Sequence, residues 1–300
     1  MLDYSVVVPH YNQPGDLRRC LRSLLDQTVS RSSYEIIVVD NNSQTPLDPI
    51  RKEFGDEIHL VNEPQQGAAH ARNRGMAQAK ADLLLFTDAD CVVAPNWIES
   101  CADSLETSKL CGGAIEVVTE NPARRTPTEC FELAFAFDQR KYIEEKRFSA
   151  TANLAVHRDV AAQVGAFRDQ VSEDVDWCWR AYDAGFPIVF AANAIVSHPA
   201  RRCFKELTAK WRRLTREDLN LRREYGFSLQ STMLRQAAVA ASPFAHWIRV
   251  MRRKDFSLRE KTGAVAVLFA VRFYRFGYGM RLLLQDRRAW QARKAAVSAA

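Results

Sequence analysis

The stretch that most constrains this chain spans residues 83–91, where four large apolar residues are followed by Asp88 and Asp90. An apolar run without alternation is typical of a strand covered by helices on both faces, as in a parallel sheet. Open α/β sheets bind ligands at the carboxyl ends of their strands. The stretch therefore predicts a buried strand that ends in a binding site.

The two aspartates predict a metal site if the backbone stays extended beyond the strand. Side chains two residues apart in an extended chain point the same way, so both carboxylates would face one point. Such oxygen ligands suit Mg²⁺ or Mn²⁺, which bind one or two carboxylates and fill their shell with water and substrate phosphate oxygens. The alternative is a turn in which Asp88 only caps the helix that follows.

Strand-like and helix-like stretches alternate along the first half of the chain, which indicates a mostly parallel, doubly wound α/β sheet flanked by helices. Here strands are predicted at 6–8, 35–39, 58–61 and 83–86, and helices at 15–27, 49–54, 68–79 and 96–107. Later strands are predicted at 111–118, 152–156 and 195–197, and helices at 128–142, at 158–164 and from residue 173 to Gly185.

Polar or aromatic residues follow three of the predicted strands, at 9–12, 40–43 and 88–90. Neither Gly-x-Gly-x-x-Gly nor a Walker loop is present, so a dinucleotide site and a P-loop ATPase lose support. An aromatic ring to stack on a base, a carboxylate to accept its ring N–H and a metal for a diphosphate would together hold a nucleotide.

A second acidic cluster comprises Glu173, Asp174 and Asp176 at the start of a predicted helix. Acidic residues at a helix start and Gly185 at its end are favourable capping chemistry, so the cluster is explained by a well-capped helix alone. Three carboxylates within four residues exceed what a cap needs. One of them could serve as a general base.

The five motifs of the first 200 residues, taken in order, resemble the family 2 glycosyltransferases with the GT-A fold. They are SVVVPHYN (5–12), EIIVVDNNS (35–43), GAAHARNRG (67–75), LFTDAD (85–90) and EDVDWCWR (173–180). The resemblance implies a GT-A type fold for nucleotide-diphospho-sugar transfer, with a Rossmann-like sheet. It implies an inverting enzyme that moves a sugar from a nucleotide-diphosphate sugar to a hydroxyl acceptor, either a glycan or a lipid-linked molecule.

The resemblance also implies a role for each matching residue. Asp174 would be the catalytic base, with Glu173, Asp176 and Trp179 on the acceptor side. The donor would be held by Pro9, Tyr11, Asp40, Arg72, Asp88 and Asp90. The metal, Mg²⁺ or Mn²⁺, would be bound by Asp90, Asp88 and His198, although a lone histidine is more often structural. Many relatives carry a second Asp where this chain has Asn41.

The resemblance divides the chain into a catalytic domain at 1–200 and a C-terminal region at 201–300. The nucleotide-binding half would span about 1–110 and the acceptor-binding half about 111–200. Rival interpretations are a sugar nucleotidyltransferase, whose glycine-rich loop is missing after Val8, and a non-catalytic nucleotide-sugar-binding protein. Release of nucleoside diphosphate rather than pyrophosphate would indicate glycosyl transfer.

The C-terminal region is basic and is predicted to be helical at 204–225, 229–251 and 258–285. The first 200 residues hold 19 Lys and Arg against 29 Asp and Glu, a net charge of −10, whereas the last 100 hold 23 against 7, a net charge of +16. These charges fit either a solvated helix face or peripheral contact with an anionic membrane surface. A nucleic-acid partner is not expected, because the catalytic half is acidic and no binding motif is visible.

Two basic groups with aromatic residues define the candidate membrane contact. The first is Arg201, Arg202, Phe204, Lys205, Lys210, Trp211, Arg212 and Arg213, and the second is Trp247, Arg249, Arg252, Arg253 and Lys254. The apolar stretch 262–271 is too short to cross a bilayer. With seven cysteines that form no Cys-x-x-Cys pair and no apolar leader after Met1, we expect a cytoplasmic protein, placed at the inner face of the membrane.

Overall fold

The structure is a computed structural model that describes residues 2–286 and 290. Contacts divide the described chain into two compact units. Unit 1 comprises Met1–Glu116, Phe137–Asp169 and Glu173–Pro199, and unit 2 comprises Val117–Ala136, Gln170–Ser172 and Ala200–Ala300. The C-terminal region thus shares unit 2 with two segments from earlier in the chain, residues 117–136 and 170–172.

The described part of the chain forms one eight-stranded sheet, in the order β3-β2-β1-β4-β7-β6-β8-β5. Its strands are β1 Tyr4–His10, β2 Tyr34–Asp40, β3 His59–Asn62, β4 Leu83–Phe86, β5 Val92–Val93, β6 Leu110–Val118, β7 Leu154–His157 and β8 Val189–Pro199. Strands β1 to β4 pair in parallel, whereas β7 pairs antiparallel with both β4 and β6, and β5 with β8. The α/β class is confirmed as a mixed sheet.

Alternate residues of the central strands face different layers of helices. Val6 and Val8 of β1 pack into the core beneath α1 (Pro14–Leu25) and α4 (Trp97–Thr107), whereas Val7 packs against α3 (Ala68–Gln78) and α8 (Glu173–Asp183). All three valines are fully buried. Burial on both faces is the reason that these strands read as continuous apolar runs. The helices of this unit are α1 Pro14–Leu25, α2 Asp48–Phe54, α3 Ala68–Gln78, α4 Trp97–Thr107, α6 Gln139–Lys146, α7 Arg158–Val164 and α8 Glu173–Asp183.

The helix predicted at 128–142 is wrong, because the chain breaks it into α5 Pro127–Phe135 and α6 Gln139–Lys146. Phe137 between them has a left-handed backbone (φ 53°), and its ring lies 4.6 Å from that of His198. No glycine or proline marks the break. A tertiary contact therefore accompanies a bend that local propensity does not indicate.

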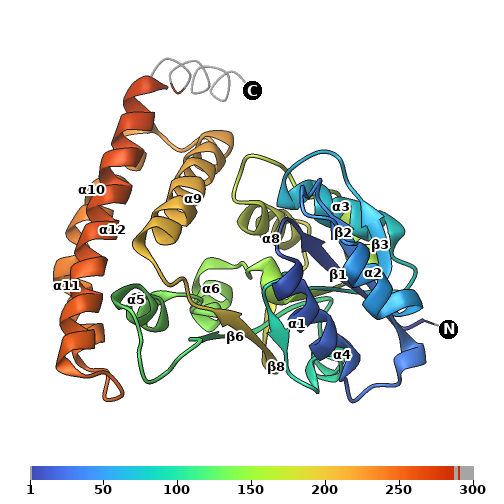
Figure 1. The fold of residues 1–300 in the computed structure, drawn as a ribbon. Coiled ribbons are helices and arrows are strands. Elements are labelled where there is room, and N and C mark those ends of the chain that lie inside the picture. The colour runs from blue at the N-terminus through green and yellow to red at the C-terminus, as the bar shows by residue number, and fades with distance from the viewer. Residues whose placement is uncertain (1, 287–289, 291–300) are drawn as a thin grey trace. The chain divides into compact units, whose positions relative to one another are not determined.

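Unit 2 is built from helices that pack along α12 (Figure 1). They are α5, α9 Phe204–Glu224, α10 Leu229–Ala241, α11 Pro243–Met251 and α12 Leu258–Gln285. The single helix predicted at 229–251 is wrong, since Pro243 separates α10 from α11. Proline has no N–H to donate and ends the regular helical hydrogen bonding there. None of the described helices is long and apolar enough to cross a membrane.

The first predicted basic group is partly turned inward in unit 2. Glu132 of α5, 2% exposed, accepts hydrogen bonds from Lys210 Nζ (3.0 Å) and from the backbone N–H of Arg201 (2.8 Å). The guanidinium of Arg275 lies 3.7 Å from the centre of the Trp211 ring. Lys210, Arg201 and Trp211 are therefore engaged by Glu132 and Arg275 within unit 2, which corrects the prediction that these three side chains contact a membrane. The other members of the group stay exposed: Arg202, Phe204, Lys205, Arg212 and Arg213.

Candidate active site

The loops that follow β1 and β2 are tied to each other at the carboxyl edge of the sheet. Asn12, in the left-handed backbone region (φ 56°), accepts with Oδ1 from the backbone N–H groups of Gln44 (2.8 Å) and Thr45 (3.1 Å). Its own N–H donates to Ser43 Oγ (2.9 Å). Asparagine adopts this region more readily than most residues. The two loops therefore form one fixed rim.

Asp40 lies on this rim and is oriented by His10, which is almost fully buried beneath it. His10 Nε2 accepts from the backbone N–H of Gln13 (3.0 Å), so Nδ1 carries the proton and faces Asp40 Oδ1 at 3.5 Å. Burial lowers the pKa of His10 despite the raising effect of Asp40. The ring is therefore neutral at neutral pH. The Asp40 side chain above it stays 22% exposed.

Tyr11 and Pro9 lie at the end of β1, as the sequence predicted. Tyr11 is 45% exposed, and its hydroxyl accepts a hydrogen bond from Gln66 Nε2 (3.1 Å). Pro9 is half-buried and pairs with Val39 of β2. An exposed ring anchored through its hydroxyl offers a flat face on which a planar group can stack.

Asn41 has a structural role that explains the departure noted in the sequence. It is 6% exposed, and its Nδ2 donates to the carbonyls of Gln65 (2.7 Å) and Glu63 (3.3 Å). Its Oδ1 accepts from the backbone N–H of Gly67 (2.7 Å). An ionised aspartate has no hydrogen to donate to those carbonyls. Asparagine at this position therefore fixes the loop that leads into α3.

Arg72 of α3 joins two of the predicted site motifs. It is 4% exposed; one terminal nitrogen donates to Asp88 Oδ1 (2.8 Å) and the other to Glu173 Oε1 (2.9 Å). Burial opposes its charge, but Asp88 and Glu173 outweigh burial and raise the pKa of Arg72. One guanidinium thus holds the end of β4 against the start of α8.

The other acidic residues of α8 differ in their surroundings. Asp174 is half-buried in the first turn, and its Oδ1 accepts from the backbone N–H of Val175 (2.8 Å). Asp176 is fully buried and paired with Arg180 (2.9 Å) and Arg168 (3.3 Å), so it holds the helix in place rather than facing an acceptor. Trp179 is half-buried and donates to the carbonyl of Lys146 (2.9 Å).

The backbone after β4 turns instead of staying extended, which corrects the premise behind the paired aspartates. The N–H of Cys91 donates to the carbonyl of Asp88 (3.0 Å). As a result Asp88 reaches Arg72, whereas Asp90 Oδ2 lies 3.5 Å from His198 Nε2. Among the described residues, no three His, Cys, Asp or Glu side chains converge as a ready-made set of metal ligands.

Asp90 and His198 nevertheless have the chemistry of a two-ligand metal site. His198 Nδ1 lies 2.8 Å from the carbonyl of Pro199, which favours the tautomer that leaves the Nε2 lone pair directed toward Asp90. Mg²⁺ and Mn²⁺ accept such a partial set because phosphate and water complete their shell. A divalent cation would also offset the charge between an anionic diphosphate and the surrounding carboxylates. The residues present therefore fit the group.

Two residues that position the site were not predicted to do so. His10 lies within the first motif. Its place in the sequence, between a buried strand and the polar residues that follow it, was the signal from which its contact with the site could have been predicted. Phe137 lies against His198, and no feature of the sequence indicated that contact.

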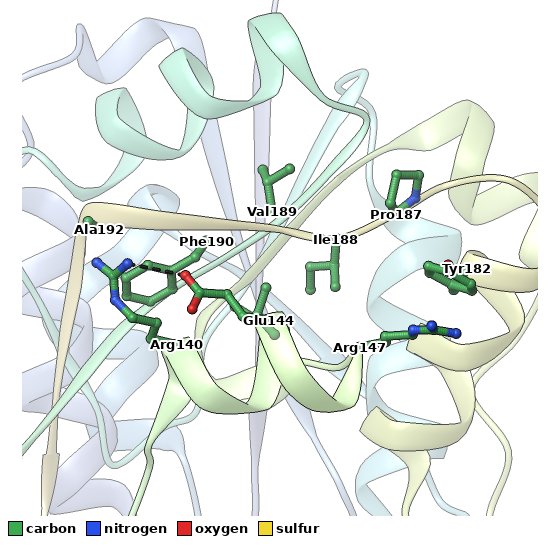
Figure 2. A pocket seen from close by; sticks show the side chains of 10 residues that line it. Arg140, Glu144, Arg147, Tyr182, Pro187, Ile188, Val189, Phe190 and Ala192 are labelled. Carbon is green, nitrogen blue, oxygen red and sulfur yellow. Dashed lines mark hydrogen bonds and ion pairs between the residues drawn. The ribbon is translucent and has the colours of Figure 1, made fainter.

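A separate cavity of about 460 Å³ lies at the opposite end of β8 from His198 (Figure 2). It is lined by Arg140, Ile143, Glu144, Arg147, Tyr182, Pro187, Ile188, Val189, Phe190 and Ala192. His198 lies six residues beyond Ala192 along the strand, a distance of about 20 Å at the usual rise per residue. Its volume is therefore no argument for placing the donor there.

Comparison with known proteins decides the family. The model of "Glycosyl transferase family 2" matches residues 5–168, more than half of the chain. The chain belongs to glycosyl transferase family 2. Glycosyltransferase AglE of Haloferax volcanii is 34% identical over 214 residues, which is 69% of each chain. A glucosyl-dolichyl phosphate glucuronosyltransferase of the same organism is 26% identical over 218 residues, covering 65% of this chain and 68% of that protein.

A solved structure supports the fold of this family 2 glycosyltransferase. The mannosyltransferase PcManGT from Pyrobaculum calidifontis, in complex with GDP-Man and Mn²⁺, aligns with a TM-score of 0.54. The alignment covers 99% of this chain and 80% of that one at 17% sequence identity, so it shows the fold alone. The predicted GT-A fold class is confirmed, and the protein is a nucleotide-sugar glycosyltransferase.

Proposed function

We propose that this family 2 glycosyltransferase transfers a sugar with inversion from a nucleotide-diphosphate sugar to a hydroxyl acceptor, with Asp174 as the general base. The link through Arg72 carries the proposal. It brings the helix that bears Asp174 to the strand end that bears Asp88, so a base and a donor site can face the same sugar.

The reaction is a direct displacement at the anomeric carbon. Asp174 accepts the proton of the acceptor hydroxyl while that oxygen bonds to the anomeric carbon, and the bond from this carbon to the diphosphate oxygen breaks. The nucleoside diphosphate leaves with the bonding electrons. Tyr11 stacks on the base, Asp40 accepts its ring N–H and Asp88 binds the ribose. Glu173 and Trp179 lie toward the acceptor.

Asp90 and His198 hold the Mg²⁺ or Mn²⁺ ion. When bound, the ion stabilises the negative charge that develops on the departing diphosphate. Asp90 Oδ2 and His198 Nε2 lie 3.5 Å apart, close enough for one ion to contact both atoms. Each is a ligand atom of a type that Mn²⁺ accepts, which supports the assignment. The metal in the PcManGT complex supports the same class of ion.

We propose a lipid-linked saccharide as the acceptor and the inner face of the membrane as the place of reaction. The support is the name of the relative that acts on a glucosyl-dolichyl phosphate, together with the basic helices of residues 201–300. Family membership favours glycosyl transfer over nucleotidyl transfer.

The test measures donor binding separately from transfer. The purified full chain is incubated with a panel of nucleotide-diphosphate sugars and lipid-linked saccharides, and nucleoside diphosphate release is followed with Mn²⁺ and with EDTA. Asp174→Asn should lower transfer by about a hundred to ten thousandfold, because general base catalysis is typically worth that much. Calorimetry should show donor affinity within about threefold of the parent.

Asp183→Asn is the matched control, since Asp183 is exposed at the other end of α8. It should leave transfer unchanged. Turnover of Asp174→Asn within a few-fold of the parent would remove Asp174 from the proposed role. Release of pyrophosphate in place of nucleoside diphosphate would contradict the proposed reaction itself.

The metal is tested by calorimetry of Mn²⁺ and nucleoside diphosphate, which needs no acceptor. Asp90→Asn and His198→Ala should each abolish the gain in nucleotide affinity that Mn²⁺ provides. Asp26→Asn, at an exposed position after α1, should keep that gain. An unchanged gain in both site variants would exclude these ligands.

A further inference from the structure

Helix α10 of unit 2 buries polar side chains and exposes apolar ones, which is the reverse of an ordinary surface helix. Its buried side chains are Thr232 and Gln236, which are polar. Its exposed positions include Leu234, 71% exposed, and three alanines at the following turns of the same face. These alanines are Ala237, Ala238 and Ala241. A helix in water normally buries its apolar face, so this arrangement calls for an apolar covering.

The exposed apolar face continues onto α11. Phe244 is 68% exposed, Trp247 42% and Ile248 40%, at helical spacing. Ser242 between the two helices has helical dihedrals (φ −60°, ψ −27°), and its N–H donates to the carbonyl of Ala238 (2.9 Å). The exposed side chains of α11 therefore continue the exposed side of α10 beyond Pro243. We call the exposed side chains of both helices the apolar face.

Aromatic contacts extend the apolar face toward α12. The ring of Phe244 lies 5.2 Å from that of Phe269, edge to face, and Phe269 lies 6.1 Å from Phe273. Phe273 is itself 48% exposed. Figure 1 shows α10 and α11 running along α12. Three helices thus contribute apolar groups to one surface of unit 2.

The distribution of charge around the apolar face indicates what covers it. Residues 236–248 contain no Asp, Glu, Lys or Arg. Immediately after them come Arg249, Arg252, Arg253 and Lys254. Arg253 binds Asp255, but Arg252 and Lys254 are exposed and make no ion pair with another described residue. Tryptophan beside lysine and arginine at the edge of an apolar face suits the headgroup region of an anionic bilayer.

We propose that the apolar face is a membrane-surface anchor that lies in the plane of an anionic bilayer. Leu234, Phe244 and Ile248 enter the boundary between headgroups and acyl chains, while Arg252 and Lys254 bind lipid phosphates. A second copy of the chain is a poorer occupant, because residues 236–248 contain no Asp or Glu and the same face of that copy would offer no carboxylate to Arg252 and Lys254. The anchor does not depend on which sugar the enzyme transfers.

The experiment is vesicle flotation of the full-length protein. The parent should float with phosphatidylcholine vesicles that contain 30% phosphatidylglycerol (about one lipid in three carries charge) and detach at high salt. Phe244→Ser with Ile248→Ser should lower the partition coefficient at least tenfold, because two large apolar side chains no longer leave water. Arg252→Glu with Lys254→Glu should lower binding to anionic vesicles about tenfold and leave little salt dependence.

Phe204→Ser is the matched control, since Phe204 is 39% exposed in unit 2 but belongs to the first basic group. It should float like the parent. Circular dichroism and nucleotide affinity, which the surface changes should not alter, verify folding. Equal flotation of the parent and the Phe244/Ile248 variant, or equal binding to neutral and anionic vesicles, would overturn the proposal. A parent dimer that becomes monomeric in that variant would assign the face to a second copy instead.

Discussion

At the scale of single residues, Arg72 connects positions that are 16 residues and 101 residues away in the sequence. Its planar fork can bind both carboxylates at once, whereas the ammonium of lysine is a compact point charge on a flexible stem. The spacing between Asp88 and Glu173 therefore depends on the shape of this side chain as well as its charge.

We expect Arg72→Lys to separate the two carboxylates. The variant should lose about 1–3 kcal/mol of unfolding free energy, because one of two partly buried carboxylates loses its charged partner. Transfer should fall at least tenfold while nucleoside diphosphate affinity changes less. Urea denaturation and calorimetry measure these effects. Arg74→Lys, at an exposed position of the same helix, should behave like the parent. Equal stability of both variants would contradict the bridging role.

Asn41 gives a second prediction at this scale. Asn41→Asp should lower the unfolding free energy by about 1–3 kcal/mol at neutral pH, because a carboxylate would face the carbonyls of Gln65 and Glu63 without a hydrogen to donate. Asn42→Asp introduces the same charge at the adjacent exposed position and should cost little. Chemical denaturation compares the two. A smaller loss for Asn41→Asp than for Asn42→Asp would refute the explanation.

At the scale of elements, α3 lies on β1 and β2 through Gly75. A Cβ added there would come within 2.3 Å of Val7 Cγ1 and 3.3 Å of Val39 Cγ2. Both neighbours are fully buried strand residues that cannot move freely. Helix α3 can thus approach the sheet only because Gly75 has no side chain. This approach also sets the position of Arg72, three residues earlier.

Gly75→Ala should therefore destabilise the protein by about 1–3 kcal/mol, the usual cost of overpacking a core. Gly15→Ala is the control, since Gly15 is also helical and nothing lies within 4 Å of its added Cβ. It should be neutral or stabilise by up to about 1 kcal/mol, because alanine favours helices. Thermal unfolding of the two variants tests the contact, and a stabilised Gly75→Ala protein would disprove it.

At the scale of the whole molecule, stability should decline in two stages as the pH falls. The pKa of His10 is lowered from its ordinary 6.5 in the folded state, so below pH 6.5 the unfolded chain binds the proton more readily. Burial raises the pKa of Glu132, but Lys210 and Arg201 outweigh burial and hold that pKa below its ordinary 4.5. The stability that depends on ionised Glu132 is therefore lost only below about pH 4.5.

Thermal unfolding at pH 7.5, 5.5 and 4.0 separates the two stages. The parent should be less stable at pH 5.5 than at pH 7.5, and His10→Gln should reduce that difference because glutamine does not titrate. The further loss at pH 4.0 should persist in His10→Gln. A parent whose stability is unchanged between pH 7.5 and 5.5 would contradict the burial argument for His10.

Much of the fold could be predicted from the sequence, because hydrophobic periodicity depends on neighbours along the chain. The helices predicted at 158–164 and 258–285 have the observed bounds, and the strands predicted at 6–8, 35–39, 58–61 and 83–86 are observed as the parallel strands β1 to β4. The motifs at the strand ends sufficed to predict the family. These are properties of local spacing and residue type.

Only the tertiary structure decided which partner each polar side chain meets. Asp88 and Asp90 are alike in the sequence, yet one binds Arg72 and the other faces His198. Asp176 is buried between two arginines, and Lys210 is directed onto Glu132 instead of a membrane. The reason is physical: these partners come from segments far apart in the chain, and the choice between them depends on burial and approach in three dimensions. The hydrophobic periodicity of the sequence carries no information about the burial of a polar side chain or about which distant segment approaches it.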